Sequence, residues 1–506
     1  MLKTSMKNFD NYSLSPITGK KYLLPSENDN IKIDNFLSDN KGKKVVVVQG
    51  LGFVGAVMSL ICSNALTEEY AVIGVDLANE NTYWKIASIN EGIFPVIASD
   101  PKINEFFEKT KFKGNFLATY DNYAYTLADI IIVDINLDVA KNADFEKNLL
   151  SFDVDLTPFK KGLDAIGNNC KDDVLILVET TVPPGTCSKI AYPAIKNCLI
   201  KRGLSPDKFK LGHSYERVMP GPNYIDSIQN FYRVFSGIDE RSAVETEMFL
   251  RTIISTEKYP LTRLGNTNAT EMAKVLENSY RAMNIAFIVE WSRFAELAGV
   301  NLYEVVKAIR MRPTHSNMML PGIGVGGYCL TKDPLLASWS KQNLFDSTTS
   351  LNQSETSVQI NDQMPLFAFN YLKETFAESL SGKKILLLGV SYRSDVADTR
   401  YTPVEPFYDY LVSEGAVVSL HDSYVDQWEE KSTKVSSDLK QMIEEQIDAL
   451  IFCTNHSEYM NNADLIHLLM QKEKLFIFDT IGVLNEKEIH ILNQKHIVKV
   501  VGRGDI

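Results

Sequence analysis

A short apolar strand that runs into a glycine turn and then a helix constrains this fold most. Four valines and Gln49 precede Gly50-Leu51-Gly52-Phe53-Val54-Gly55, and the helix-compatible stretch AVMSLICSNAL follows. In such a unit the first glycine permits a tight turn, the second lets a pyrophosphate approach the backbone, and the third allows close helix–strand packing. The helix N-terminus then faces the phosphates. The segment predicts a dinucleotide-binding βαβ unit.

The next predicted strand supports this interpretation. It ends at Asp76, about 20 residues beyond Gly55, where the dinucleotide fingerprint expects an acid. A carboxylate there bonds the ribose hydroxyls and repels a 2′-phosphate, so we expect NAD rather than NADP. We expect NAD to lie against the glycine turn and to contact Phe53 and Val54 there. The alternative is a Rossmann-like fold that binds no dinucleotide.

The hydrophobic pattern alternates between strand and helix in two regions of the chain. Expected strands are 44–49, 71–76, 130–134, 174–179 and 209–213, then 385–389, 417–421, 450–454, 475–479 and 498–501. Between the regions, 269–298 predicts one helix of about 30 residues. We expect an α/β protein with two Rossmann-like, doubly wound parallel-sheet domains joined by a helical domain. The expected boundaries are a polar extension with little structure (1–40), the NAD-binding domain (41–245), the helical domain (246–375) and a C-terminal domain (376–506).

Composition excludes several classes of partner. The 506 residues carry a formal net charge of −12, which argues against nucleic acid and anionic membranes. The six cysteines are scattered without CxxC spacing, which indicates a reducing compartment with no disulfide framework and no zinc or other metal site. The first 22 residues lack the apolar core of a signal peptide. We therefore expect a cytoplasmic protein.

A second glycine-rich loop carries a cysteine. Gly322, Gly324, Gly326 and Gly327 precede Cys329, and Lys332-Asp333-Pro334 follows. We expect Asp333 to cap a helix with proline at its first position. A thiol beside a cation and a helix N-terminus has what it needs for a lowered pKa and for nucleophilic chemistry. The alternative is a buried free cysteine beside an ordinary helix cap.

Other polar residues have two readings from pattern alone. Glu216 and Arg217 form either a surface ion pair or part of a site. Lys274 and Asn278 share one face of the long helix, and the pattern leaves the burial of Lys274 open. Thr181 follows a predicted strand, where ligands of parallel sheets bind.

Taken in order, these segments resemble the UDP-glucose/GDP-mannose dehydrogenase family. The similar segments, which span about residues 43–505, are GLGFVG, ETTVPPGT, YERVMPG, EMAKVLENSYRAMNIAF, PGIGVGGYCLTKDP, GVSYRSDVADTRYTP and LHDSYV. ERVMPG and NIAF are more similar to the branch that oxidises UDP-N-acetylhexosamines. The resemblance implies NAD-dependent four-electron oxidation of the C6 hydroxyl of a UDP-sugar through a thiohemiacetal and a thioester.

The resemblance also implies roles for individual residues. Cys329 is the nucleophile, Lys274 and Asp333 hold a water that takes the alcohol proton, Asn278 positions the water or the oxyanion, and Glu216 assists hydrolysis. Thr181, Lys332 and Arg400 match cofactor contacts. The substrate-binding candidates, which include Lys274 and Asn278 again, are Arg217, Arg312, Gly326 and Arg393.

Two departures from the family pattern bear on the site. Arg393 stands where lysine is usual, and an arginine fork is not a lysine point charge. Residues 134–138 replace a usual Thr-Pro ending, so the nicotinamide-side contact differs. The long helix and the resemblance predict a homodimer or a higher oligomer, in which Arg312 is a candidate to reach a neighbouring subunit's site.

Three other functions remain as alternatives. The first is a UDP-glucose or GDP-mannose 6-dehydrogenase, and the second is a two-electron dehydrogenase of the hydroxyacid or phosphogluconate type. The third is a non-catalytic regulatory protein that binds nucleotide sugars. The cysteine loop argues against the two-electron enzymes, which need no thiol. The presence of Cys329, Lys274 and Asp333 argues against the regulatory protein.

Overall fold

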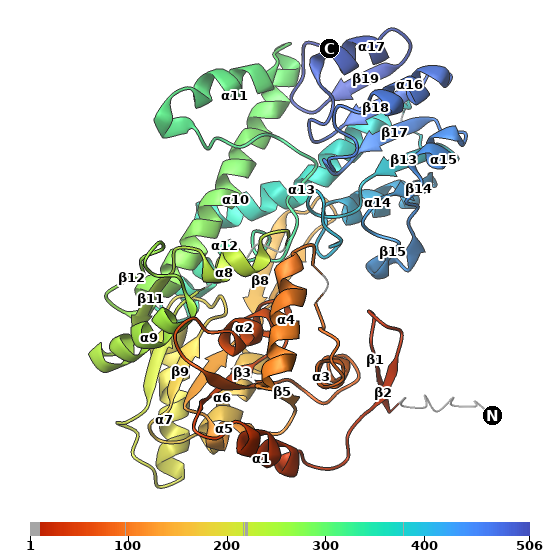
Figure 1. Cartoon of the computed structure of the whole chain (residues 1–506). Helices are drawn as coiled ribbons and strands as arrows, with labels where there is room; N and C mark the ends of the chain where they lie inside the picture. The colour runs from red at the N-terminus through yellow and green to blue at the C-terminus, as the bar shows by residue number, and fades with distance from the viewer. Residues whose placement is uncertain (1–10, 97, 216, 218–220, 378) are drawn as a thin grey trace, which may run out of the picture. The chain divides into compact units, whose positions relative to one another are not determined.

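The computed structural model describes residues 11–96, 98–215, 217, 221–377 and 379–506 (Figure 1). They form two compact units. The first contains the chain up to Asp138 together with Asp155–Lys274, and the second contains Val139–Val154 and Val275–Ile506. The predicted class, α/β with two parallel Rossmann-like sheets and a long helix, is confirmed.

The first unit is built on an eight-stranded sheet in the order β12-β11-β10-β9-β6-β3-β4-β5. From β5 to β10 the strands are parallel and follow the dinucleotide-fold order 3-2-1-4-5-6, while β11 is antiparallel to β10. The bounds are β3 Lys44–Gln49, β4 Tyr70–Val75, β5 Phe116–Thr119, β6 Ile130–Val133, β9 Leu175–Val178, β10 Lys210–His213, β11 Val234–Gly237 and β12 Thr262–Arg263. The order reverses between β3 and β6, where a ligand is expected beyond the carboxyl ends.

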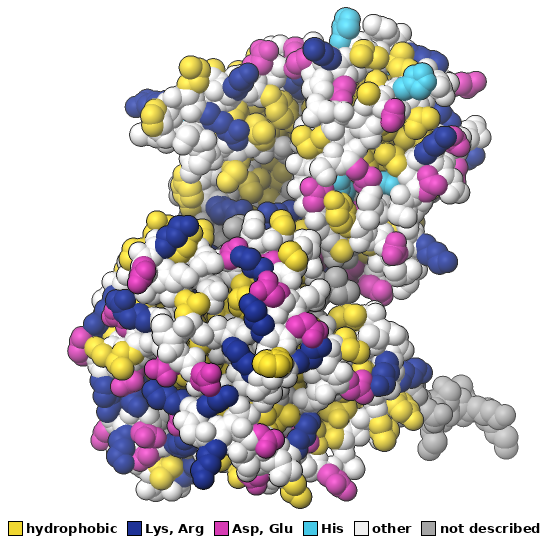
Figure 2. All heavy atoms as spheres, in the orientation of Figure 1, with side chains coloured by type: hydrophobic (Ala, Val, Ile, Leu, Met, Phe, Trp, Pro, Cys, Tyr) yellow, Lys and Arg dark blue, Asp and Glu magenta, His cyan; other side chains and the backbone are white. Residues whose placement is uncertain are grey.

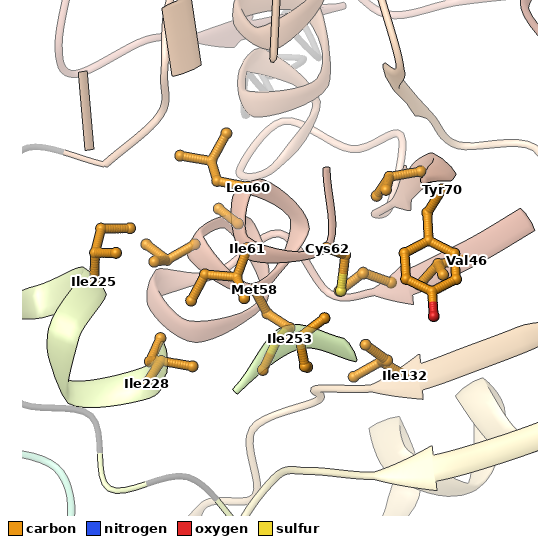
Figure 3. Close-up of a cluster of buried hydrophobic side chains, with 14 of the residues drawn as sticks. Val46, Met58, Leu60, Ile61, Cys62, Tyr70, Ile132, Ile225, Ile228 and Ile253 are labelled. Carbon is orange, nitrogen blue, oxygen red and sulfur yellow. The ribbon is translucent and has the colours of Figure 1, made fainter. Parts of the chain in front are cut away.

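Helices flank this sheet. They are α2 Phe53–Ser63, α3 Tyr83–Asn90, α4 Pro101–Lys113, α5 Tyr123–Leu127, α6 Thr157–Asn169, α7 Tyr192–Lys201, α8 Tyr224–Gln229 and α9 Glu240–Ile253. Helix α2 is apolar on all sides, and Gly55–Ser63 is buried throughout. Figure 3 shows Met58, Leu60, Ile61 and Cys62 of α2 among side chains from β3, β4, β6, α8 and α9. A helix that is hydrophobic all round is stable in water only when other elements cover it on all sides. This packing holds α2 in place directly after the glycine turn.

The prediction of little structure before residue 41 is wrong for the residues described. β1 Tyr12–Leu14 pairs with β2 Lys21–Leu23, and α1 Asn30–Asp39 follows. The Ser13 hydroxyl donates to the Glu80 carbonyl and accepts from the Trp84 N–H. Three-residue strands held by polar side chains have no long apolar pattern, so the sequence did not reveal them.

The second unit contains a group of long helices and a second parallel sheet. Its elements are the hairpin β7 Val139–Ala143 and β8 Leu149–Val154, most of α10 Thr267–Leu297, α11 Leu302–Arg310, α12 Asp333–Asn343 and α13 Asn352–Thr375. The predicted long helix is confirmed as α10. The hairpin was not expected. Its Asp153 accepts from the indole N–H of Trp339 in α12, at 2.7 Å.

The second sheet has five parallel strands in the order β14-β13-β17-β18-β19. Its elements are β13 Lys384–Leu388, β14 Val417–His421, β17 Ala449–Phe452, β18 Phe476–Asp479, β19 Ile497–Val500, α14 Val404–Ser413, α15 Leu439–Glu444, α16 Ala463–Gln471 and α17 Glu486–Leu492. Ile385 and Leu387 pack on one face with α13 and α14, and Leu386 and Leu388 pack on the other. The topological switch lies between β13 and β17.

Candidate active site

The three glycines of the first turn have different surroundings. Gly50 has a φ of +98°, and a Cβ there would lie 2.2 Å from the Asp134 carbonyl oxygen. At Gly55 a Cβ would lie 1.9 Å from the Gly50 oxygen, because α2 packs against the turn. At Gly52, by contrast, a Cβ meets nothing within 4 Å. The open space beside Gly52, at the start of α2, fits a pyrophosphate.

Asp76 lies against this turn. Its carboxylate accepts hydrogen bonds from the N–H of Leu51 at 3.0 Å and of Leu77 at 2.8 Å, and Lys85 is 3.6 Å away. The end of β4 therefore brings an acid beside the glycine turn, where the fold positions a ribose. Phe53 is exposed and Val54 half-buried at the start of α2. The glycines, the helix N-terminus and this acid together fit NAD.

A buried glutamate that the sequence reading missed holds the loop after β9. Glu271 of α10 accepts from the N–H of Gly185 at 2.6 Å and of Cys187 at 2.7 Å. Burial raises the pKa of Glu271 to about 7, although these hydrogen bonds oppose the rise. Thr181, half-buried, begins the same loop. The available signal was the glutamate of EMAK, one helical turn before Lys274.

Tyr215 is in contact with two predicted site residues. The Lys274 ammonium lies 5.5 Å from its ring centroid and the Arg217 guanidinium 5.4 Å from it. Arg217 also donates to the Tyr215 hydroxyl at 3.2 Å. Lys274 is 8% exposed, which answers the question that the pattern left open. Glu216 lies outside the described residues.

In the second unit, the glycines before Cys329 are required by close packing. A Cβ at Gly324 would lie 2.3 Å from Pro403, and one at Gly326 2.6 Å from the Cβ of Tyr392. Gly327 has a φ of +80° and also faces the Tyr392 ring. The loop therefore lies directly on the segment that follows β13. Cys329 is exposed, whereas the other five cysteines are buried.

Asp333 follows Cys329 by one helical turn and is fully buried. Its carboxylate accepts from the Asn278 amide at 2.7 Å and from the Lys332 ammonium at 3.0 Å. Lys332 also lies 4.3 Å from the centroid of the Tyr328 ring. The prediction that Asp333 caps the helix is wrong: α12 begins at Asp333 itself, with Lys332 at the cap position. Its carboxylate instead binds α10, which only the tertiary fold brings near.

The remaining predicted cations are exposed. Arg393 lies in the loop after β13, at the switch of the second sheet, and Arg312 follows α11. Arg400 makes a two-pronged ion pair with Asp398, with nitrogen–oxygen distances of 2.9 and 2.6 Å. Within each unit the fold thus gathers part of the predicted set: Gly50–Gly55 with Asp76, Lys274 with Arg217, and Asn278, Lys332 and Asp333 near Cys329.

The described residues lack two kinds of feature, a cluster of metal ligands and a membrane-spanning helix. No group of three or more His, Cys, Asp or Glu side chains in this part of the chain could hold a metal ion. Nor does any described helix combine the length and apolar character needed to cross a bilayer.

Comparison with known proteins covers most of the chain. Three models of the UDP-glucose/GDP-mannose dehydrogenase family match it in order: the NAD-binding domain at residues 43–253, the central domain at 268–363 and the UDP-binding domain at 386–486. The UDP-N-acetyl-D-mannosamine dehydrogenase of Methanocaldococcus jannaschii is 28% identical over 467 residues, which are 92% of this chain and 97% of that one. That of Pyrococcus horikoshii is 27% identical and covers 91% of this chain and 100% of its own.

Solved structures of nucleotide-sugar dehydrogenases are similar to this protein over nearly its whole length. UDP-D-ManNAc dehydrogenase from Pyrococcus horikoshii has a TM-score of 0.76 at 25% identity and covers 91% of this chain and 100% of that one. NDP-N-acetyl-D-galactosaminuronic acid dehydrogenase from Methanosarcina mazei has a TM-score of 0.74 at 25% identity and covers 94% and 98%.

Proposed function

Because the chain belongs to the UDP-glucose/GDP-mannose dehydrogenase family and is an NAD-dependent nucleotide-sugar dehydrogenase, we propose that it oxidises the C6 hydroxyl of a UDP-N-acetylhexosamine to the uronic acid. The relatives named for UDP-N-acetyl-D-mannosamine support the choice of sugar. The observation that carries the proposal is the exposed thiol of Cys329 one helical turn before a buried carboxylate that holds Asn278 and Lys332. In sum, one alcohol, two NAD⁺ and one water give a carboxylate, two NADH and three protons.

The first oxidation requires a base for the C6 hydroxyl proton. NAD⁺, when bound, accepts the hydride in each of the two oxidations. Asp333 and Lys274 hold a water that receives the proton, and the ammonium stabilises the negative charge that develops on oxygen. Asn278 is fixed by its hydrogen bond to Asp333, so its amide is oriented before substrate arrives. Such preorganisation lowers the barrier without reorganisation during the reaction.

Covalent capture follows. The Cys329 thiolate forms a bond to the aldehyde carbon, and the carbonyl oxygen takes a proton to give a thiohemiacetal. The second oxidation converts this adduct to a thioester. Water then adds to the thioester carbon, the carbon–sulfur bond breaks, and the thiolate and the acid are released. Glu216, which lies outside the described residues, is the proposed base for this water. Capture keeps the aldehyde on the enzyme between the two steps.

The nucleotide is assigned to the second unit. Arg393 stands at the switch point of the β13–β17 sheet, where open α/β sheets bind ligands, and an exposed guanidinium suits a diphosphate. Arg312, Arg217 and Gly326 are proposed substrate contacts. Thr181, Lys332 and Arg400 are proposed cofactor contacts. We also propose that the domain boundaries lie near residues 40, 245 and 375 and that the enzyme is cytoplasmic.

We also propose that the protein is a homodimer. In the part of α10 that belongs to the second unit, seven large apolar side chains are at least 37% exposed and recur at spacings of three and four residues: Leu276, Tyr280, Met283, Phe287, Trp291, Phe294 and Leu297. Figure 2 shows hydrophobic side chains gathered around α10 and α11. The stripe spans about 30 Å of helix and has the a/d spacing of a helix–helix seam. A second copy of α10 presents the same stripe and would cover it in a symmetric contact.

The test is a count of NADH per sugar. Purified protein is incubated with excess NAD⁺ and limiting UDP-ManNAc, UDP-GlcNAc, UDP-GalNAc, UDP-glucose or GDP-mannose. We expect two NADH per molecule of one UDP-N-acetylhexosamine and a roughly thousandfold or greater loss in Cys329→Ala. Cys198→Ala, a change at a buried thiol in α7, is the matched control. One NADH per sugar, or full activity in Cys329→Ala, would contradict the mechanism.

A further inference from the structure

A buried histidine in the second unit is not used by the proposed reaction. His456 follows β17 and is fully buried. One ring nitrogen, Nε2, lies 3.0 Å from the Asp422 carboxylate, and the other, Nδ1, accepts the backbone N–H of Asp395 at 2.9 Å. Tyr424 stacks on the ring at a centroid distance of 5.0 Å. Both nitrogens are therefore occupied, and neither faces solvent.

The surrounding donors decide the tautomer of this histidine. Asp422 also accepts from the N–H groups of Val390 and Ser391, at 2.9 and 3.1 Å, and from the Ser391 hydroxyl. Burial opposes ionisation, but the hydrogen bonds to Asp422 hold its pKa below the ordinary value, so it accepts only. His456 must then donate from Nε2, which leaves Nδ1 free of a proton to accept from Asp395.

These contacts hold both ends of one short loop. Asp422 binds the start of the loop at Val390 and Ser391, and His456 binds its end at Asp395. Asp395 has a φ of +58°, which is unfavourable for a residue with a side chain, and its carboxylate accepts from the N–H and hydroxyl of Ser457. A strained residue persists only where its surroundings hold it. Between these two ends lies Arg393, exposed at the switch point.

We propose that His456 is a positioning residue for nucleotide recognition. Through its Nδ1 bond to the Asp395 N–H, it fixes the 390–395 loop so that Arg393 is directed at the diphosphate of the substrate. The inference rests on the proposed function, since it assigns Arg393 to UDP. His456 touches no substrate, and its effect is on affinity for UDP rather than for NAD.

Two substitutions separate the two ring nitrogens. In His456→Asn the side-chain oxygen can take the place of Nδ1, whereas in His456→Gln the amide nitrogen can take the place of Nε2. Dissociation constants for UDP and for NAD are measured by calorimetry on the full chain. We expect His456→Gln to weaken UDP binding roughly tenfold, because it leaves the Asp395 N–H without its acceptor. We expect His456→Asn to stay within about threefold, and NAD binding to change in neither.

A double substitution shows whether His456 acts through Arg393. Arg393→Ala should weaken UDP binding, and His456→Gln should have no further effect in that background, because coupled residues are not additive. Equal effects of His456→Gln in both backgrounds would overturn the inference, as would wild-type affinity in His456→Gln. Failure of the unaltered protein to bind UDP would instead overturn the proposed function, and the inference with it.

A measurement on the unaltered protein covers the case in which a variant fails to fold. Amide hydrogen exchange reports whether the Asp395 N–H is held. We expect strong protection at Asp395 and weaker protection at Arg393, even without nucleotide. Exchange at Asp395 as fast as in an unstructured loop would overturn the inference.

Discussion

Gly52 and Gly55, the second and third glycines of the turn, predict opposite outcomes for the same substitution to alanine. Gly55→Ala puts a methyl 1.9 Å from the Gly50 oxygen, about 1.5 Å inside ordinary van der Waals contact. The obstacle is backbone, so α2 must move away from β3. Overpacking of this kind costs about 1–3 kcal/mol or more. At roughly 2–4 °C per kcal/mol for a unit of this size, we expect the melting temperature of the first unit to fall by several degrees.

Gly52→Ala should leave the fold intact and weaken the binding of NAD. Its backbone, at φ −76° and ψ −165°, suits alanine, and nothing lies within 4 Å of the new methyl. We expect a stability loss of about 1 kcal/mol or less, from the poorer helix cap. The methyl fills the space proposed for the pyrophosphate, so NAD affinity should fall at least tenfold, or about 1.4 kcal/mol.

The assay pairs thermal denaturation with calorimetric titration of NAD. Gly265→Ala is the matched control, because this glycine also lies in the first unit, has open space around its Cβ position and is far along the chain from the turn. NAD affinity of the wild-type level in Gly52→Ala would refute the placement of the pyrophosphate. Unchanged stability in Gly55→Ala would refute the packing argument.

Three further predictions follow from buried charges and the exposed stripe. Burial raises the pKa of Glu271 to about 7 from 4.5, so the folded state binds this proton more tightly than the unfolded state does. Stability of wild type relative to Glu271→Gln should therefore fall by about 3 kcal/mol as pH rises from about 4.5 to 7, and a pH-independent difference in urea midpoints would contradict this. Arg233 and Glu179 form a buried pair at 2.6 Å. Arg233→Met should destabilise by about 3–5 kcal/mol and the double variant with Glu179→Gln by much less, as measured by melting temperature; equal losses would show that the pair is not coupled. Trp291→Arg should convert the proposed dimer to monomer in sedimentation, whereas Phe112→Arg, at a 95% exposed position, should not.

Periodicity and glycine placement predicted most of the local structure. The strands that the apolar runs indicated are present, and the long helix begins and ends within two residues of its prediction. The pattern did not reveal several short or polar elements, among them the N-terminal hairpin, β5 and the β7–β8 hairpin. Their strands have three to six residues, and the two hairpins bury little apolar surface, so the pattern that marks a core strand is weak.

The sequence by itself determined the turn at Gly50–Gly55, the cysteine loop and the residue types of a dehydrogenase site, because each depends on neighbours along the chain. It placed Asp333 at a helix start, but the prediction that its carboxylate caps that helix is wrong. Only the tertiary structure brought Asp333 to Asn278, Glu271 to the Gly185 N–H, and Asp422 to His456 and the loop of Arg393. A buried polar side chain takes whichever partner packing brings to it. That partner is remote in sequence, so no local pattern records it.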